Sequence, residues 1–280
     1  MNYAKIIKLS RKAVLYLILF AIALIWIIPI YTLTATAIKP KQDFFDGASL
    51  FSIPTSIAWS NFSDAFIQGR LALYMRNGII VSTLKVPLGI FIGALAAFAL
   101  ARLKIKNRTG IFVFFLIGMM LPHQVALVPI NVIYARLGLH NTFFGLFYAY
   151  IGFGLSLAIL ILRGFFRTIP KEIDDAALID GCGKWRLFWN IIMPISKPAV
   201  ATLVISDFLA TWNEYLLAMV IINDTSKQTI PVGLMTFVGE YGTDFGLLCA
   251  GVLISIIPVM IVYLVFQRHF VEGVAGAVKA

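Results

Sequence analysis

The sequence predicts an all-α, polytopic membrane protein with six transmembrane helices. Hydrophobic residues make up 60% of the chain, charged residues only 13%, and the mean hydropathy is +0.92, whereas soluble domains are about half apolar and a quarter charged. Apolar runs long enough to cross a bilayer recur along the chain. One long polar stretch, 163–198, interrupts them. The formal net charge of +10 would indicate nucleic acid in a soluble chain, but in a membrane protein its distribution between loops matters more.

Six apolar runs are expected to span the membrane. The first, 13–38, follows a basic start and is too long for the apolar core of a cleaved signal peptide, so we expect it to be retained. The other five are expected at 78–101, 110–133, 143–162, 199–222 and 245–266. About forty residues of mixed polarity follow the first span, and their aromatic side chains favour an external segment that lies partly in the membrane interface.

Basic residues predict the orientation of these spans. If both termini, the 102–108 loop and the 163–198 stretch lie on one side, that side holds about 16 of the 23 Lys and Arg residues. The positive-inside rule makes it the cytoplasmic side. We therefore expect a cytoplasmic N-terminus (1–12), a membrane domain (13–268) and a cytoplasmic C-terminal tail (269–280).

Three charged residues and one histidine fall inside the expected spans. Asp207 and Glu214 are costly in a membrane unless they face protein or water, so we expect both to point inward. Lys85 lies near the outer end of the second span, where we expect its side chain to extend to the headgroups rather than to line a pore. His123 is expected to be a hydrogen-bonded packing residue, and since no second His lies nearby, no metal site is assigned.

The polar stretch begins with the signals of a short helix. Pro170 fits a first helical turn, and Asp174 and Asp175 follow where carboxylates favour the positive end of a helix. Gly181 and Gly183 can end that helix in a conformation that other residues adopt at a cost. The sequence therefore predicts a short helix that begins near Pro170.

An amphipathic segment is expected directly after this helix. Large apolar side chains recur there with the spacing of one helix face, after which two prolines break the pattern: Trp185, Phe188, Trp189 and Ile192, then Pro194 and Pro198. Such a segment can lie against a bilayer or a helix bundle.

The same stretch carries a motif. Asp175-Ala176-Ala177, three residues, Gly181, nine residues and then the run 191–194 (Ile-Ile-Met-Pro) resemble the EAA motif, E-A-A-x3-G-x9-I-x-L-P, of ABC importer permeases. Two positions depart from it, because Asp175 stands for Glu and Met193 for Leu. The alternative is a solvated acidic helix between two membrane spans.

Three further segments resemble the carbohydrate-uptake branch of these permeases, on the side of the maltose-importer G subunit. They are Trp212-Asn213-Glu214-Tyr215, the run 228–233 and the ending 267–279. The resemblance implies the type I ABC importer permease fold in a bacterial or archaeal cell membrane. It implies one half of a heterodimeric pore, completed by a sister permease subunit, two cytoplasmic ATP-binding subunits and an extracytoplasmic sugar-binding protein. The chain lacks a GxxxxGK[ST] phosphate loop, so ATP and Mg are expected on the partner ATPases, with no catalytic residue or cofactor here.

The resemblance also implies residue roles. The coupling loop is 164–197, and its ATPase-coupling residues are Asp174, Asp175, Ala176, Ala177, Leu178, Ile179, Asp180 and Gly181. The candidate pore or substrate residues are Trp212, Asn213, Glu214 and Tyr215, which combine aromatic faces with amide and carboxylate groups. Packing against the sister subunit is the equal alternative for these four.

Two more segments receive roles in the same way. An outer loop with Gly239, Glu240, Tyr241 and Gly242 is expected to reach into the binding protein. A C-terminal tail with Gly273, Gly276 and Val278 is expected in the seam between the ATPases, with an amphipathic tail resting on the membrane as the alternative.

Other functions remain open on the residues alone. A permease of the same branch for a sugar or glycerol phosphate ester would carry the same motifs. A secondary transporter would usually show repeated halves, which are not found in this sequence. An intramembrane enzyme would need paired catalytic groups, for which Asp207 and Glu214 are the only candidates. The two cysteines, Cys182 and Cys249, are expected in different environments, so neither a disulfide nor redox chemistry is predicted.

Overall fold

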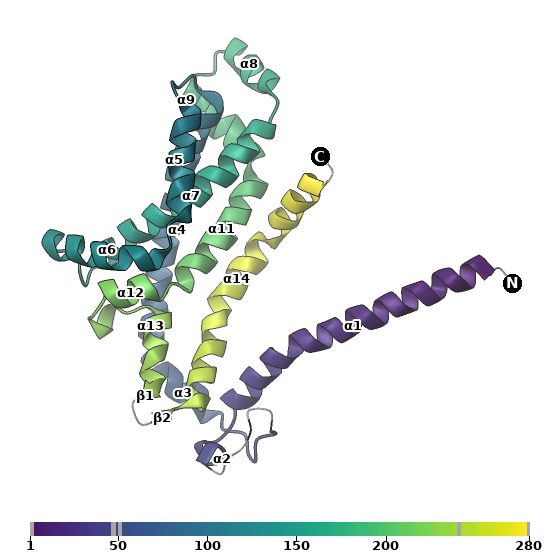
Figure 1. The fold of residues 1–280 in the computed structure, drawn as a ribbon, viewed down its shortest axis with the longest axis vertical. Coiled ribbons are helices and arrows are strands. Elements are labelled where there is room, and N and C mark those ends of the chain that lie inside the picture. Colours follow the sequence, from purple (N-terminus) through teal and green to yellow (C-terminus); the bar gives the residue numbers. More distant parts are fainter. Residues whose placement is uncertain (1–2, 46–48, 50–51, 240–241, 279–280) are drawn as a thin grey trace. The chain divides into compact units, whose positions relative to one another are not determined.

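The computed structural model describes residues 3–45, 49, 52–239 and 242–278 (Figure 1). The chain divides into two compact units, Met1–Arg70 with Thr236–Ile254 and Leu71–Met235 with Ser255–Ala280, and each is described by itself. Regular structure in the described residues is helical apart from one two-stranded hairpin. The predicted all-α class is confirmed.

The first unit contains the first expected span and a polar segment. Its elements are α1 (Tyr3–Ala37), α2 (Lys41–Phe45), α3 (Ser60–Ile67), β1 (Val238–Gly239), β2 (Gly242–Thr243) and the first turns of α14 (Phe245–Val278). The most apolar window of α1 is wholly exposed in this chain, which leaves it free to contact lipid or another subunit. Asn61 holds the polar segment to the end of α1, because its Nδ2 donates to the carbonyl oxygens of Ala37 (2.9 Å) and Lys39 (2.8 Å).

The second unit is a helix bundle with a short helical excursion. Its elements are α4 (Leu71–Arg102), α5 (Arg108–Met120), α6 (His123–Leu137), α7 (Phe143–Thr168), α8 (Lys171–Ile179), α9 (Lys184–Arg186), a π-helical turn η1 (Leu187–Ile192), α10 (Met193–Ile195), α11 (Lys197–Trp212), α12 (Leu216–Ile221), η2 (Thr225–Lys227), α13 (Ile230–Leu234), η3 (Met235–Phe237) and the rest of α14.

Helix α4 is the centre of the second unit and packs along α7 and α11. Small residues allow the close approach to α7, as is usual between membrane helices. A Cβ at Gly93 of α4 would lie 2.6 Å from the Cβ of Ala158 on α7. A further cluster of buried residues joins α4, α6, α7, α12 and α13: Val81, Tyr134, Leu146, Ala149, Tyr150, Leu217, Ala218, Ile221, Ile222 and Val232. The core therefore lies where these helices meet α4 and α7.

The third expected span, 110–133, is not one straight helix but two helices joined by a bend. Helices α5 and α6 meet at 95°. Leu121 ends α5 in an extended conformation (φ −76°, ψ 117°), which is the conformation that a following proline favours. Pro122 then precedes α6 with an extended backbone and no N–H to continue the ladder.

The fifth expected span is also divided. A 75° bend at Ser196 separates the α9–α10 segment from α11, as the expected break around Pro194 and Pro198 requires. At its other end α11 stops at Trp212, and Asn213 to Tyr215 separate it from α12. The expected span 199–222 therefore contains two helices, α11 and α12, with a break at its outer end.

Four helices of the described part of the chain are long and apolar enough to cross a membrane. They are Lys12–Ala37, Leu71–Arg102, Phe143–Thr168 and Phe245–Arg268. The two bent pairs, Arg108–Met120 with His123–Leu137 and Lys184–Ile195 with Lys197–Trp212, bring the number to six if each pair is one span. This agrees with the six spans predicted from the sequence.

Candidate functional site

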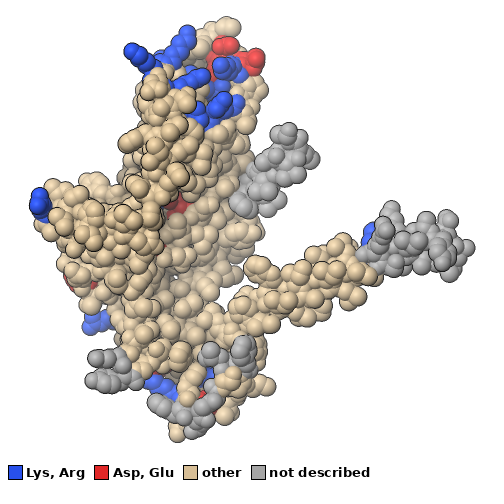
Figure 2. Space-filling model, viewed as in Figure 1, with Lys and Arg blue, Asp and Glu red and all other residues tan. Residues whose placement is uncertain are grey.

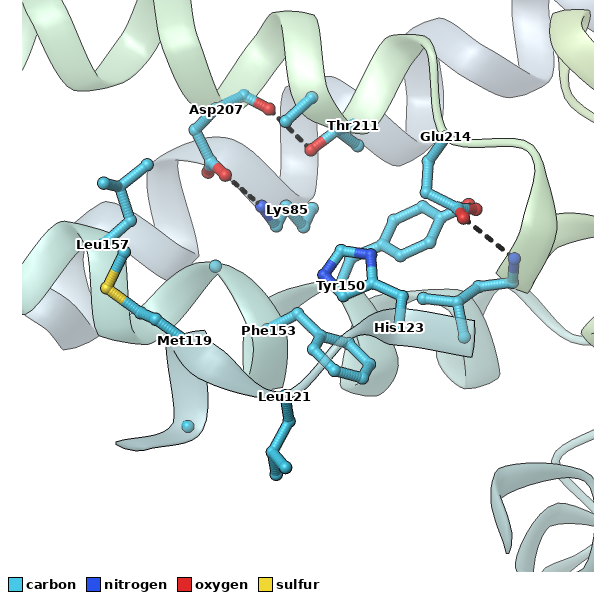
Figure 3. A pocket seen from close by; sticks show the side chains of 14 residues that line it. Lys85, Met119, Leu121, His123, Tyr150, Phe153, Leu157, Asp207, Thr211 and Glu214 are labelled. Carbon is cyan, nitrogen blue, oxygen red and sulfur yellow. Dashed lines mark hydrogen bonds and ion pairs between the residues drawn. The ribbon is translucent and has the colours of Figure 1, made fainter. Parts of the chain in front are cut away.

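A cavity of about 240 Å³ lies inside the second unit (Figure 3). It is bounded by α4, α5, α7 and α11 and by the ends of α6 and α12. Its lining residues are Lys85, Gly118, Met119, Leu121, His123, Tyr150, Phe153, Gly154, Leu157, Asp207, Ala210, Thr211, Glu214 and Leu217. One wall is therefore apolar and aromatic, while the α4 and α11 side carries charged and hydroxyl groups.

An ion pair joins α4 to α11 at this cavity. Lys85 Nζ contacts Asp207 Oδ1, and the two side chains are only 3% and 12% exposed. Gly154 of α7 leaves room for the pair, since a Cβ there would lie 2.9 Å from Lys85 Nζ and 3.1 Å from Asp207 Oδ1. The expectation that Lys85 extends to the headgroups is wrong, because the facing helix supplies the opposite charge inside the bundle. The expectation that Asp207 faces protein is confirmed.

Glu214 holds the break between α11 and α12. Its Oε2 accepts from the Tyr150 hydroxyl (2.8 Å) and from the backbone N–H of Ala218 (3.0 Å), and its Oε1 accepts from the N–H of Leu217 (2.8 Å). The carboxylate thereby satisfies two N–H groups that the start of α12 leaves without partners. Glu214 faces inward as expected, and its position depends on α7 as well as on α12.

The four candidate pore residues have different environments. Glu214 lines the cavity, whereas Trp212 is buried, stacks on Phe208 with ring centroids 5.5 Å apart, and donates from Nε1 to the Ser255 carbonyl (3.1 Å). Asn213 is exposed and Tyr215 packs against the cluster around α12. Trp212 and Tyr215 thus pack within this chain, and the cavity brings in Lys85, Tyr150 and Thr211 beside Glu214, as Figure 3 shows.

His123 and Phe153 form the aromatic side of the cavity. His123 is the first residue of α6, directly after the bend, and its ring lies against that of Phe153 with centroids 4.2 Å apart. The contact agrees with the packing part of the prediction for His123, but the residue is exposed and the described residues give its ring no hydrogen-bond partner. The described residues contain no group of three or more His, Cys, Asp or Glu side chains that could hold a metal ion.

The coupling-loop residues form a second site at α8. The helix starts after Pro170, as predicted, with Glu172 and Asp174 in its first turn. Its end is a Schellman motif, because the N–H of Cys182 donates to Ala177 O (2.8 Å) and that of Gly181 to Leu178 O (3.1 Å). Gly181 has φ +79°, which confirms the predicted left-handed position. Gly183 has φ −68° and is extended, so its expected part in the cap is wrong.

Exposure separates the two faces of α8. Ala177 is buried, whereas Leu178 and Ile179 are 54% and 86% exposed. The remaining motif residues Asp175, Ala176, Asp180 and Gly181 are exposed as well. Helix α8 thus presents apolar side chains beside carboxylates, with no neighbour in the described chain covering them.

An ion pair ties α8 to the bundle. Arg102, the last residue of α4, has a side chain only 4% exposed; its Nη1 lies 3.3 Å from Asp174 Oδ2 and its Nη2 donates to Ile169 O (2.8 Å). Burial raises the pKa of Asp174, while the Arg102 charge acts in the opposite direction. Sequence reasoning had placed Arg102 only in a basic loop, since nothing local relates it to an aspartate on another element.

The segment after α8 is only partly amphipathic as predicted. Phe188 and Ile192 of the π-helical turn η1 are buried, but Trp185 of α9 and Trp189 of η1 are exposed. Trp189 stacks on Phe91 of α4 with centroids 5.8 Å apart.

The outer-loop and tail residues are described in part. Gly239 and Gly242 pair in the β1–β2 hairpin, while Glu240 and Tyr241 lie outside the described residues. The backbone of Gly273, Gly276 and Val278 continues helix α14. Both cysteines are free.

These features define a class of protein: a multi-pass membrane bundle with a polar internal cavity and a short exposed helix held to the bundle end. The chain belongs to the family of binding-protein-dependent transport system inner membrane components, whose model matches residues 89–275.

Curated relatives match nearly the whole chain. A probable ABC transporter permease protein, YurM of Bacillus subtilis, is 38% identical over 95% of this chain and 86% of its own. A probable permease for starch degradation products, AmyC of Thermoanaerobacterium thermosulfurigenes, is 33% identical over 96% and 97%. A diacetylchitobiose uptake permease, NgcG of Streptomyces coelicolor, is 31% identical over 95% and 87%.

A solved structure shares the fold. A chain of a bacterial ABC transporter involved in the import of the acidic polysaccharide alginate aligns with a TM-score of 0.79 over 96% of this chain and 99% of that one. Its sequence identity is 23%, so this likeness concerns the fold. The predicted type I importer permease fold is confirmed.

Proposed function

We propose that the chain is the non-catalytic permease subunit of an ATP-driven, binding-protein-dependent carbohydrate importer. It would form the translocation pore with a sister permease and receive force from two cytoplasmic ATP-binding subunits, which bind ATP and Mg. The family membership and the relatives named for starch degradation products and diacetylchitobiose support this proposal.

The exposed apolar tip of α8 is the observation that carries the proposal. Leu178 and Ile179 are exposed at the end of α8, and both belong to the motif segment. The other face of α8 is held to the bundle by the Arg102–Asp174 ion pair. Burial of an Ile side chain in a partner cleft contributes about 2 kcal/mol, or roughly a thirtyfold change in affinity. Asp175 and Asp180 beside this tip suit a basic rim on the ATPase.

Force would pass from α8 to the pore through Arg102 and Asp174. Because Arg102 ends α4, and α4 also carries Lys85 at the cavity, a displacement of α8 acts on the helix that lines the pathway. Such coupling is only as large as the difference in contacts between the two states of the transporter. The coupling loop 164–197 would thus transmit a displacement of the ATPase subunits to α4.

The cavity would form one wall of the sugar pathway. Its volume is below the 300–1,000 Å³ usual for a complete small-molecule site, as expected if a sister subunit supplies the facing wall. Phe153 and Tyr150 offer aromatic faces for sugar C–H groups, and Thr211 and Glu214 lie beside them. A phosphate-ester solute would need an unpaired cation, but Lys85 is neutralised by Asp207, so the cavity favours a neutral sugar.

The remaining contacts follow from the same assembly. With α8 on the cytoplasmic side, both termini are cytoplasmic and the β1–β2 hairpin is external, where it would contact a sugar-binding protein. The end of α14, with Gly273, Gly276 and Val278, would reach the seam between the ATPases. Of the four candidate pore residues, we assign Glu214, rather than Trp212, to the sugar pathway.

Ile179→Glu tests this function. The variant should insert in the membrane at wild-type levels but lose copurification of the ATPase subunits, with an affinity loss of about thirtyfold or more, since it removes the apolar contact and adds a charge. Ile179→Leu is the matched control and should retain the ATPases and sugar-stimulated ATP hydrolysis in proteoliposomes. Wild-type ATPase yield with Ile179→Glu would contradict the proposal.

A further inference from the structure

A second, strongly basic pocket lies at the α8 end of the helix bundle. Its cavity of about 290 Å³ is lined by Leu100, Ala101, Arg102, Arg108, Thr109, Arg163, Arg167 and Lys171. Figure 2 shows Lys and Arg side chains gathered at the end of the second unit that carries α8 and α9. The pocket is separate from the central cavity and shares no lining residue with it.

The pocket holds five cations and, among the described residues that line it, no carboxylate. Asp174 of α8 forms an ion pair with Arg102, and the positive charge of Lys171 also acts on this carboxylate. Arg108, Arg163 and Arg167 add three further positive charges around the same cavity. Like charges held together in this way favour an anionic occupant.

Two of the arginines also have unused hydrogen-bond donors. The Nε atoms of Arg102 and Arg163 are buried and have no hydrogen-bond partner in the described part of the chain. Buried donors are normally satisfied, and each unsatisfied one has a free-energy cost. Arg163 is held in place by Phe112, with its Cζ 3.8 Å from the ring centroid. The guanidinium groups are therefore fixed in position with donating capacity left over.

The elements that form the pocket place it at a membrane boundary. Helix α4 ends at Arg102, α5 begins at Arg108, and α7 ends at Thr168. Each is a membrane-spanning helix or half of a bent span, so their polar ends lie at the depth of the lipid headgroups. An anion that is abundant at that depth is the phosphate of an acidic phospholipid.

We propose that this pocket binds the phosphate headgroup of an acidic phospholipid. Arginine forks match phosphate oxygens in a bidentate geometry, and basic pockets between membrane helices on the cytoplasmic side are suited to such headgroups. Because Arg102 contacts both the pocket and Asp174, the bound lipid lies next to the ion pair that holds α8. The proposal does not depend on which solute the protein transports.

Native mass spectrometry of the full-length chain in complex with its copurifying subunits tests the proposal. The probes are phosphatidylglycerol, phosphatidylcholine and inorganic phosphate, each added to delipidated complex. Wild type should retain phosphatidylglycerol in preference to phosphatidylcholine. Inorganic phosphate should compete poorly, because it lacks the acyl chains that hold the lipid at the membrane. Equal retention of the two lipids, or full competition by inorganic phosphate, would overturn a lipid site.

The variant is Arg108→Gln with Arg167→Gln, since both side chains are exposed and their loss leaves Arg102 and Arg163, whose Nε atoms are buried, in place. Binding of phosphatidylglycerol should weaken about fivefold for each charge removed. The matched control is Lys104→Gln with Lys106→Gln, which removes the same charge from exposed positions of the adjoining loop outside the pocket. Binding by the control should change less than twofold.

Three results would contradict the assignment. If both double variants weaken phosphatidylglycerol binding equally, the lipid responds to general surface charge and not to the pocket. If neither double variant weakens it, the lipid does not bind in the pocket. Loss of ATPase copurification in the Arg108 and Arg167 variant, with lipid binding intact, would assign the basic pocket to the ATPase surface instead.

Discussion

Lys85 and Asp207 lie 122 residues apart in the sequence and form a buried ion pair between α4 and α11. The pair connects the central helix of the bundle to the helix that bends at Ser196 and stops at Trp212. Both partners line the central cavity, so a rearrangement of α11 against α4 changes the electrostatics of the cavity at the same time.

The pair predicts an asymmetric response to mutation. Asp207→Asn leaves a buried ammonium without a carboxylate and should destabilise the protein by about 3 to 5 kcal/mol, whereas Lys85→Met with Asp207→Leu should be close to neutral because no charge remains buried. Thermal unfolding in detergent measures both. Equal destabilisation by the single and the double variant would show that the charges do not depend on each other.

Gly154 predicts a steric effect on the same pair. Gly154→Ala puts a methyl group 2.9 Å from Lys85 Nζ and 3.1 Å from Asp207 Oδ1, and should cost about 1 to 3 kcal/mol because both partners of the buried ion pair have to move. Gly152→Ala on the same helix is the control: its Cβ meets nothing within 4 Å, and alanine favours the helix by up to about 1 kcal/mol. The prediction fails if the two variants unfold at the same temperature.

Gly181 predicts a defect that is local to the coupling helix. Gly181→Leu forces a branched residue to φ +79° and should cost about 1 to 2 kcal/mol, because a left-handed backbone brings Cβ against the carbonyl. Gly138→Leu, at φ +66° at the end of α6, imposes the same backbone strain elsewhere. Only the Gly181 variant should lose ATPase copurification. Loss in both would indicate general instability instead of a docking defect.

Asp174 predicts a pH dependence of α8. Burial raises the pKa of this carboxyl above its ordinary value of 3.8, against the lowering effect of Arg102. A raised folded-state pKa contributes stability that is fully present below the unfolded value and is lost as pH rises through the folded one. Acidification from neutral pH toward 4 should therefore slow amide exchange in α8 of wild type relative to Asp174→Asn.

Hydrogen exchange at matched intrinsic rates measures this ratio. Other groups that titrate in the same range affect both proteins equally, so the ratio isolates Asp174. A ratio that stays constant would show that the Arg102 charge balances the burial, and a shift toward faster wild-type exchange at low pH would show that the charge outweighs it; either result contradicts the prediction.

The sequence by itself determined the class of the molecule, the apolar segments that make up its four to six spans, and the short α8 helix. Spans are readable because about twenty apolar residues in succession have few other uses, and every backbone group of a helix is satisfied within the helix itself. The start of α8 at Pro170 and its end at Gly181 were readable for a similar reason, since backbone constraints act within a few residues.

Only the tertiary structure decided which polar residues meet. Lys85 finds Asp207, Tyr150 finds Glu214 and Arg102 finds Asp174 across separate helices, and hydropathy contains no information on such partners. The sequence contained one signal of such a contact. Lys85 and Asp207 are opposite charges in different spans, and an unpaired charge inside a membrane is costly, so the two could be expected to pair. The bend at Pro122 was not predicted because an apolar run continues through it, and hydropathy does not distinguish one straight helix from two helices that meet at 95°.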